Sequence, residues 1–252
     1  MKKALIVLAV IFLMIGVSGQ AGAAPIKWSQ PPDWDYGYDI LSGVDSGNIQ
    51  IVADDWQCTD GLPITDLHWW GSYTEDTNPN VEIGLLSPAT NFWIAVWSDV
   101  PATESITEYS HPGTLLGQSK VDGLTGYKDG YQTQAQHNGY KYEINLSDDP
   151  IFQDLGTIYW LSILATDEST WGWKTASTHN NDWAVKRSGF AATEDPPTDW
   201  MDIGTMETLG VDMAFDLNSN NPVPEPTTMM LLGSLATGLF GFAGLRRRFT
   251  RN

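Results

Sequence analysis

The chain has 252 residues, with 13 Lys and Arg against 31 Asp and Glu, which gives a formal net charge of −18. This charge repels phosphate and argues against nucleic acid as a partner. The single cysteine excludes an internal disulfide, and the aromatic content of 12% is too high for a disordered acidic tail. The length suffices for one domain with its own hydrophobic core.

The first 23 residues have the pattern of a secretory signal peptide. Met1-Lys2-Lys3 is a short cationic start, and an uninterrupted apolar run follows from Ala4 to Val17. This run is too short for a spanning helix, which argues against an uncleaved anchor, and Ala21-Gly22-Ala23 fits the A-x-A cleavage pattern. We therefore expect export and a mature chain that starts at Ala24 or Pro25.

Residues 24–218 are predicted to form one exported all-β domain, a jelly-roll-like β-sandwich. Short segments rich in β-branched and aromatic residues alternate with turn residues and show no long helical period. Because Phe92–Trp97 and Ile158–Leu164 are apolar on both faces, we expect them in central strands or with one face against a covering loop. The expected strands are Ile49–Ala53, Ile64–Tyr73, Phe92–Ser98, Tyr140–Leu146, Ile158–Ala165 and Val211–Leu217.

The exported region carries no signature of a common catalytic site, since H-E-x-x-H, G-x-S-x-G and nucleotide-binding loops are absent. Residues 24–223 hold 30 acidic and 7 basic residues. A carboxylate pair could therefore act as in glycoside hydrolysis, with Asp54, Asp55 and Asp66 as the first suspects.

No pattern requires a cofactor, although Ca²⁺ would suit the many carboxylates. Asp33, Asp35 and Asp39 place oxygens at alternate positions, as in a calcium loop. The segment departs from an EF-hand, because Tyr38 stands where that loop needs glycine and Val44 replaces the bidentate glutamate.

Tryptophan is the other prominent feature, with 12 residues in the chain. In a strand, Trp93 and Trp97 lie on one face with Ala95 between them. A row of rings can stack against sugar rings, and the same rings can instead fill a thick core that no disulfide holds. The sequence thus predicts either a glycan-stacking pair at Trp93 and Trp97 or structural packing of these rings.

The C-terminal residues have the features of a membrane anchor. A linker, 219–226, contains Pro224-Glu225-Pro226, and the apolar run Thr227 to Leu245 follows it. These 19 residues are long enough for one transmembrane helix. Arg246, Arg247 and Arg248 come next, so residues 227–252 are expected to end on the cytoplasmic side and leave the domain outside.

A Val-Pro-Glu-Pro motif, a short glycine-rich span and a terminal arginine cluster resemble, in this order, the PEP-CTERM sorting signal. In that family an exosortase, a membrane-embedded cysteine enzyme, recognises and processes the tail during transfer to the cell exterior. The matching residues here are Pro224, Glu225, Pro226, Arg246, Arg247 and Arg248.

The middle of the chain resembles a Trp-rich exported domain, without an assigned activity, of other PEP-CTERM proteins. The likeness lies in Trp28–Pro32, Ala53–Trp56, Asp60–Tyr73 and Gly156–Leu161. It implies one exported domain and says nothing of its chemistry.

Together these features predict an exported, surface-sorted protein without catalytic activity that is structural or associates with extracellular polysaccharide. Its expected partners are signal peptidase, exosortase, the cytoplasmic membrane before processing, and polysaccharide. Two alternatives stay open, a secreted carboxylate-based hydrolase and a calcium-dependent adhesin.

Overall fold

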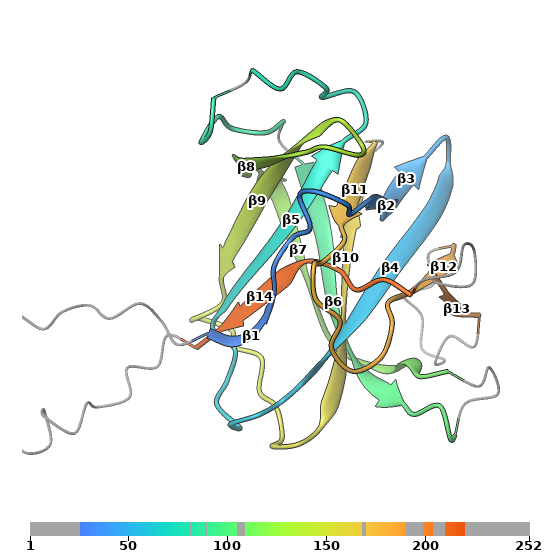
Figure 1. Cartoon of the computed structure of the whole chain (residues 1–252). Coiled ribbons are helices and arrows are strands. Elements are labelled where there is room, and N and C mark those ends of the chain that lie inside the picture. Colours follow the sequence, from blue (N-terminus) through green and yellow to red (C-terminus); the bar gives the residue numbers. More distant parts are fainter. Residues whose placement is uncertain are drawn as a thin grey trace, which may run out of the picture.

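The computed structural model describes residues 26–80, 82–88, 90–104, 109–167, 170–189, 199–203 and 210–219. The predicted signal peptide (1–23) and the tail with its motif, span and arginines lie outside these residues. In the described part the chain forms strands and no helix, so it has no helix able to cross a membrane (Figure 1). The strands are β1 (Ile26–Gln30), β2 (Asp39–Leu41), β3 (Gly43–Asp45), β4 (Asn48–Gln57), β5 (Asp66–Tyr73), β6 (Thr90–Val100), β7 (His111–Leu124), β8 (Tyr127–Gln132), β9 (His137–Asn145), β10 (Ile158–Ala165), β11 (Trp171–Lys174), β12 (Val185–Ser188), β13 (Met201–Asp202) and β14 (Phe215–Asn218).

These strands form two antiparallel sheets, so the all-β prediction is confirmed. The first, here called the β5 sheet, has the order β1-β14-β5-β11-β2, with β9 also paired to β5 and β8 paired to β9. The second, the β10 sheet, has the order β13-β12-β4-β10-β6-β7, with β3 also paired to β4. Successive segments of the chain cross repeatedly from one sheet to the other, as β4, β5 and β6 do.

The two strands predicted to be central are central. Ile158–Ala165 forms β10 at its predicted bounds, between β4 and β6, and Phe92–Ser98 lies inside β6, between β10 and β7. The predicted strand Val211–Leu217 is wrong in its first half, since β14 begins at Phe215. The backbone before it bonds elsewhere, because the N–H of Met213 donates to the Asp54 carboxylate at 2.6 Å.

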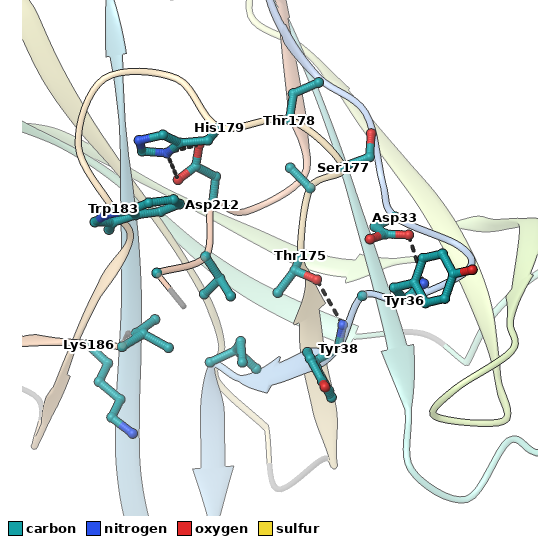
Figure 2. Close-up of a pocket in the computed structure, with 16 residues that line it drawn as sticks. Asp33, Tyr36, Tyr38, Thr175, Ser177, Thr178, His179, Trp183, Lys186 and Asp212 are labelled. Atoms are coloured by element: carbon teal, nitrogen blue, oxygen red, sulfur yellow. Dashed lines mark hydrogen bonds and ion pairs between the residues drawn. The ribbon is translucent and has the colours of Figure 1, made fainter. Parts of the chain in front are cut away.

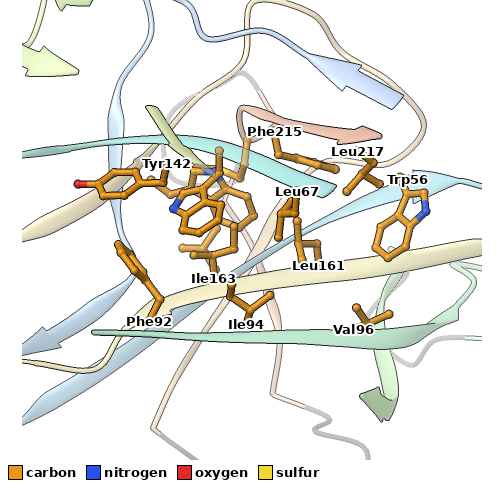
Figure 3. Close-up of a cluster of buried hydrophobic side chains, with 14 of the residues drawn as sticks. Trp56, Leu67, Phe92, Ile94, Val96, Tyr142, Leu161, Ile163, Phe215 and Leu217 are labelled. Carbon is orange, nitrogen blue, oxygen red and sulfur yellow. The ribbon is translucent and has the colours of Figure 1, made fainter. Parts of the chain in front are cut away.

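The main hydrophobic core lies between the two sheets and is largely aromatic (Figure 3). Trp69 of β5 stacks on Tyr142 of β9 with ring centroids 5.5 Å apart, and Phe92 of β6 meets both rings edge-on at 5.3 and 5.1 Å. Such ring pairs each contribute about 0.5–1.5 kcal/mol beyond the area they bury. Aromatic packing across the sheets therefore holds together a fold that has no disulfide.

A second cluster covers the outer face of the β10 sheet, and it contains the two predicted glycan-stacking rings. Trp93 and Trp97 share one face of β6, as the spacing predicts, with centroids 6.0 Å apart. Both are buried, at 1% and 3% exposed, because Trp200 packs edge-on against Trp97 at 6.2 Å. The hydroxyl of Tyr109 donates to the carbonyl of Trp200 and fixes this cover. Neither ring of the pair offers a free face to a sugar, and both pack structurally.

The first and last described strands lie side by side at one edge of the β5 sheet (Figure 1). β1 and β14 are antiparallel, with Ile26 opposite Asn218. The described body therefore begins and ends at the same edge of the β5 sheet.

Candidate functional site

A pocket of about 570 Å³ opens between the loop that precedes β2 and the segments that precede β12 and β14 (Figure 2). Its volume lies within the range of small-molecule sites in proteins, about 300–1,000 Å³. Tyr36 and Tyr38 line one side of it, and His179 and Trp183 line the other. The pocket thus combines aromatic rings with polar groups, and we take it as the candidate functional site.

The tyrosine side of the pocket is a loop held in a fixed conformation. One carboxylate oxygen of Asp33 accepts the N–H groups of Asp35 at 3.0 Å and Tyr36 at 2.9 Å. The N–H of Tyr38 donates to the hydroxyl of Thr175 at 2.8 Å. The rings of Tyr36 and Tyr38 remain 73% and 61% exposed, so two aromatic side chains stand in water on a constrained backbone.

Gly37, between these tyrosines, has no room for a side chain. A Cβ at this position would lie 2.6 Å from the carbonyl oxygen of Asp33 and 2.6 Å from the hydroxyl of Thr175. The loop can therefore pack against Thr175 only with glycine here, which ties the placement of both rings to this residue.

The opposite side of the pocket is built on an Asp–His pair. Nδ1 of His179 lies 3.0 and 3.1 Å from the two oxygens of Asp212, and Asp212 also accepts the N–H of Asn180 at 2.6 Å. Because an ionised carboxylate can only accept, Nδ1 donates and Nε2 is left for a ligand. The His179 side chain is 41% exposed, whereas that of Asp212 is buried.

Trp183 forms the base on which His179 rests. The two rings stack with centroids 3.4 Å apart and an interplanar angle of 17°. Gly210 also lies against the indole, since a Cβ at this position would lie 2.0 Å from Trp183 Cδ2. Trp183 therefore packs against both residues and is 38% exposed, whereas Tyr36 and Tyr38 are 73% and 61% exposed and present more of their rings to a ligand.

Behind the pocket lies a group of buried carboxyls. Asp54 accepts hydrogen bonds from the side-chain amide of Gln30 at 3.1 Å and from the N–H of Met213 at 2.6 Å. Burial, and then the charge of Asp212, raise the pKa of Asp54 well above its usual value. Burial also raises the pKa of Asp212, although the hydrogen bond from His179 opposes this change.

Asp55 points to the other face of β4, where it accepts the N–H of Asp182 at 3.3 Å. Burial raises its pKa to about 8, with a further contribution from the charge of Asp182. Its second carboxyl oxygen has no hydrogen-bond partner among the described residues.

The predicted hydrolase suspects do not meet in the pocket. Asp54 and Asp55 are completely buried, and Asp66 pairs with His68 at 3.0 Å on the β5 sheet. The carboxylates that do line the pocket, Asp33 and Asp212, were not singled out as such suspects.

The predicted calcium loop is the tyrosine loop of the pocket. The carboxylate of Asp33 accepts hydrogen bonds from the backbone N–H groups of Asp35 and Tyr36. Asp39 forms a buried ion pair with Lys174 at 2.8 Å. Within the described ranges, no group of three His, Cys, Asp or Glu side chains is placed to hold a metal ion. Calcium binding stays a prediction, with two of its expected ligands already engaged.

A family model described as a domain of unknown function, DUF7901, matches residues 26–218. The chain belongs to this family. The match covers the described body from β1 to the end of β14, so the pocket lies inside the DUF7901 domain. A search of the curated proteins finds no match to the chain.

The chemistry open to this DUF7901 pocket follows from its groups. Two exposed rings can stack on the apolar face of a flat, polyhydroxylated ligand, and His179 Nε2 with the pocket hydroxyls can exchange hydrogen bonds with it. The sequence alone did not reveal this arrangement, because Asp212 and Thr175 reach the site from far along the chain. The one available signal was Tyr-Gly-Tyr inside an aspartate-rich loop.

Proposed function

We propose that the chain is an exported, surface-sorted protein whose body is a non-catalytic module that binds extracellular polysaccharide. The observation that carries this proposal is the pair of exposed rings, Tyr36 and Tyr38, on a loop fixed at the mouth of a 570 Å³ pocket. We also infer that the two facing sheets form a jelly-roll-like β-sandwich, with the pocket beside the edge strand β2.

Sugar recognition explains why two tyrosines are exposed on an ordered loop, which a purely structural role does not require. A large aromatic side chain left in water costs free energy, and Tyr36 and Tyr38 are 73% and 61% exposed. Their loop is ordered by hydrogen bonds from Asp33 and Thr175, so little conformational entropy is lost when a ligand stacks on them.

The route to the cell surface is proposed from the sequence. Signal peptidase would remove residues 1–23, the span Thr227–Leu245 would hold the chain in the cytoplasmic membrane, and an exosortase would process the tail at Pro224–Pro226. One feature of the structure supports this route: β1 and β14 are paired, so the signal peptide and the tail join the body at the same edge.

The second candidate function, a carboxylate-based hydrolase, is favoured by one observation, that Asp33 and Asp212 line the same pocket. Both carboxylates are already hydrogen-bonded, Asp33 to two backbone N–H groups and Asp212 to His179 and Asn180. The Asp212 side chain is also fully buried, whereas that of His179 is 41% exposed, so the imidazole is the more accessible of the two groups to a ligand. Release of reducing sugar by wild type, and not by Asp212→Asn, would select the hydrolase.

Binding is tested by affinity gel electrophoresis of the full-length chain in detergent, with extracellular polysaccharides cast into the gel. We expect retardation of the wild type and its loss in the Tyr36→Ala/Tyr38→Ala variant. If each ring contributes about 1 kcal/mol, the dissociation constant rises about thirtyfold.

The matched control is Phe152→Ala, which removes an aromatic ring that is 77% exposed and lies outside the pocket. This variant should migrate like the wild type at every polysaccharide concentration. Equal retardation of all three proteins would contradict the proposed role of the tyrosine pair.

A further inference from the structure

Two loops lie at the end of the body where β1 begins and β14 ends. Thr65 joins them to the last strand, because its N–H donates to the carbonyl of Asn218 at 2.9 Å and its carbonyl accepts the N–H of Leu146 at 2.7 Å. Ile64 and Ile151 form an antiparallel bridge between the loops. We call this end, made of residues 58–65 and 146–157 with Ile26 and Asn218, the terminal end.

The terminal end presents large apolar side chains to solvent. Phe152 is 77% exposed, Leu155 is 69% exposed and Ile26 is 64% exposed. Between the first two, Gln153 is buried and accepts the indole N–H of Trp56 at 3.0 Å. Its amide also donates to the carbonyl of loop 58–65 at 2.7 Å. The loop is therefore held in one conformation with Phe152 and Leu155 turned outward.

The predicted span sets how far this end can be from a bilayer. Ser219 is the last described residue, and the span begins at Thr227. Eight residues reach at most about 28 Å even when fully extended. The terminal end is thus the part of the body tethered nearest the membrane surface.

We infer that the terminal end rests on the outer surface of the membrane, with Phe152 and Leu155 in the lipid interface, while the tail is still inserted. The inference rests on the proposed function, because it requires the span. The short tether gives the terminal end a high local concentration at the bilayer, which strengthens its binding to the membrane surface. Two inserted side chains can therefore hold it there, whereas a free protein would need more.

The acidic residues of the terminal end determine which lipid headgroups it can approach. Asp60 is paired with Lys27, but Asp148, Asp149 and Asp154 are exposed beside the apolar tip. Anionic headgroups repel these carboxylates, and salt screens the repulsion. The partner is therefore a bilayer surface of zwitterionic headgroups.

Contact of this kind would have a consequence for processing. Pro224 is the sixth residue after Asn218, so a terminal end held at the bilayer keeps Pro224 within about 20 Å of its surface. A membrane-embedded enzyme could then reach the segment without unfolding the body.

The test places an environment-sensitive fluorophore at single cysteines in the full chain, reconstituted in zwitterionic nanodiscs, with Cys58→Ser as background. Phe152→Cys reports the terminal end, and Ala236→Cys reports the middle of the span. Ile83→Cys is the matched control, since Ile83 is 70% exposed and follows β5 at the end opposite Asp66.

We expect the probes at 152 and 236 to be blue-shifted and quenched by spin-labelled lipid, and the probe at 83 to stay in water. The shift at 152 should weaken with anionic lipid and recover in high salt. The inference is overturned if the probe at 152 matches that at 83 while the probe at 236 is in lipid. A probe at 236 that remains in water overturns the proposed anchor and the inference with it.

Discussion

Replacing Asp55 with asparagine should stabilise the protein, and the gain should grow with pH. The carboxyl is fully buried, and its pKa is raised from 3.8 to about 8, first by burial and then by the charge of Asp182. A carboxyl with a raised folded-state pKa contributes stability that is fully present below the unfolded pKa of about 4 and is lost as the pH rises to about 8. Because one pKa unit corresponds to about 1.4 kcal/mol, the loss is at most about 6 kcal/mol.

The Asp55→Asn variant keeps the shape of the side chain and the oxygen that accepts the N–H of Asp182, but it does not ionise. Urea unfolding of both proteins at intervals between pH 4 and pH 9 gives the difference in unfolding free energy at each pH. We expect this difference to rise in favour of the variant between about pH 4 and 8 and then to level off. Parallel curves over the whole range would show that Asp55 ionises no less readily in the folded protein, which contradicts a raised pKa.

Three further predictions concern the pocket loop, the ion pair beneath it and the tail. Gly37→Ala should abolish polysaccharide retardation with little change in circular dichroism. The new Cβ would lie 2.6 Å from the carbonyl oxygen of Asp33, so the loop must move and displace the tyrosines. Unaltered binding would contradict the tight packing at this position. Lys174→Ala should lower the unfolding free energy by about 3 kcal/mol in urea titrations, since the buried Asp39 carboxylate loses its partner at 2.8 Å and keeps the contact of its other oxygen with His137 Nδ1 at 3.2 Å. A loss below about 1 kcal/mol would mean that the pair is solvated. Alanines at Pro224–Pro226 should leave the protein in the membrane fraction, and unchanged surface display would count against sorting by this motif.

The sequence predicted best where a strand is apolar on both faces. Ile158–Leu164 is apolar on both faces, which favours a central strand, and Ile158–Ala165 forms β10 at the predicted bounds. β7, His111–Leu124, was not predicted, because much of it is exposed and polar and only its pairing with β6 makes it a strand. β4 extends past its predicted end at Ala53 through two aspartates, because hydrogen bonds to Asp54 and Asp55 from distant segments allow the carboxyls to be buried.

The candidate site was less predictable than the fold, since it depends on pairs far apart in the chain. Tyr38 and Thr175 are 137 residues apart, and His179 and Asp212 are 33 apart. Local sequence contains no sign of either contact. For Trp93 and Trp97, local spacing correctly predicted that both rings lie on one face of the strand. It could not predict that Trp200, far along the chain, packs against this face.

Intact-mass spectrometry of the native protein reports at once whether the body is delivered outside the cell and whether it is detached from its tail. We expect a surface-fraction species that begins at Ala24 or Pro25 and lacks the residues from Thr227 onward. A native species found in the cytosol that begins at Met1 and ends at Asn252 would contradict this expectation.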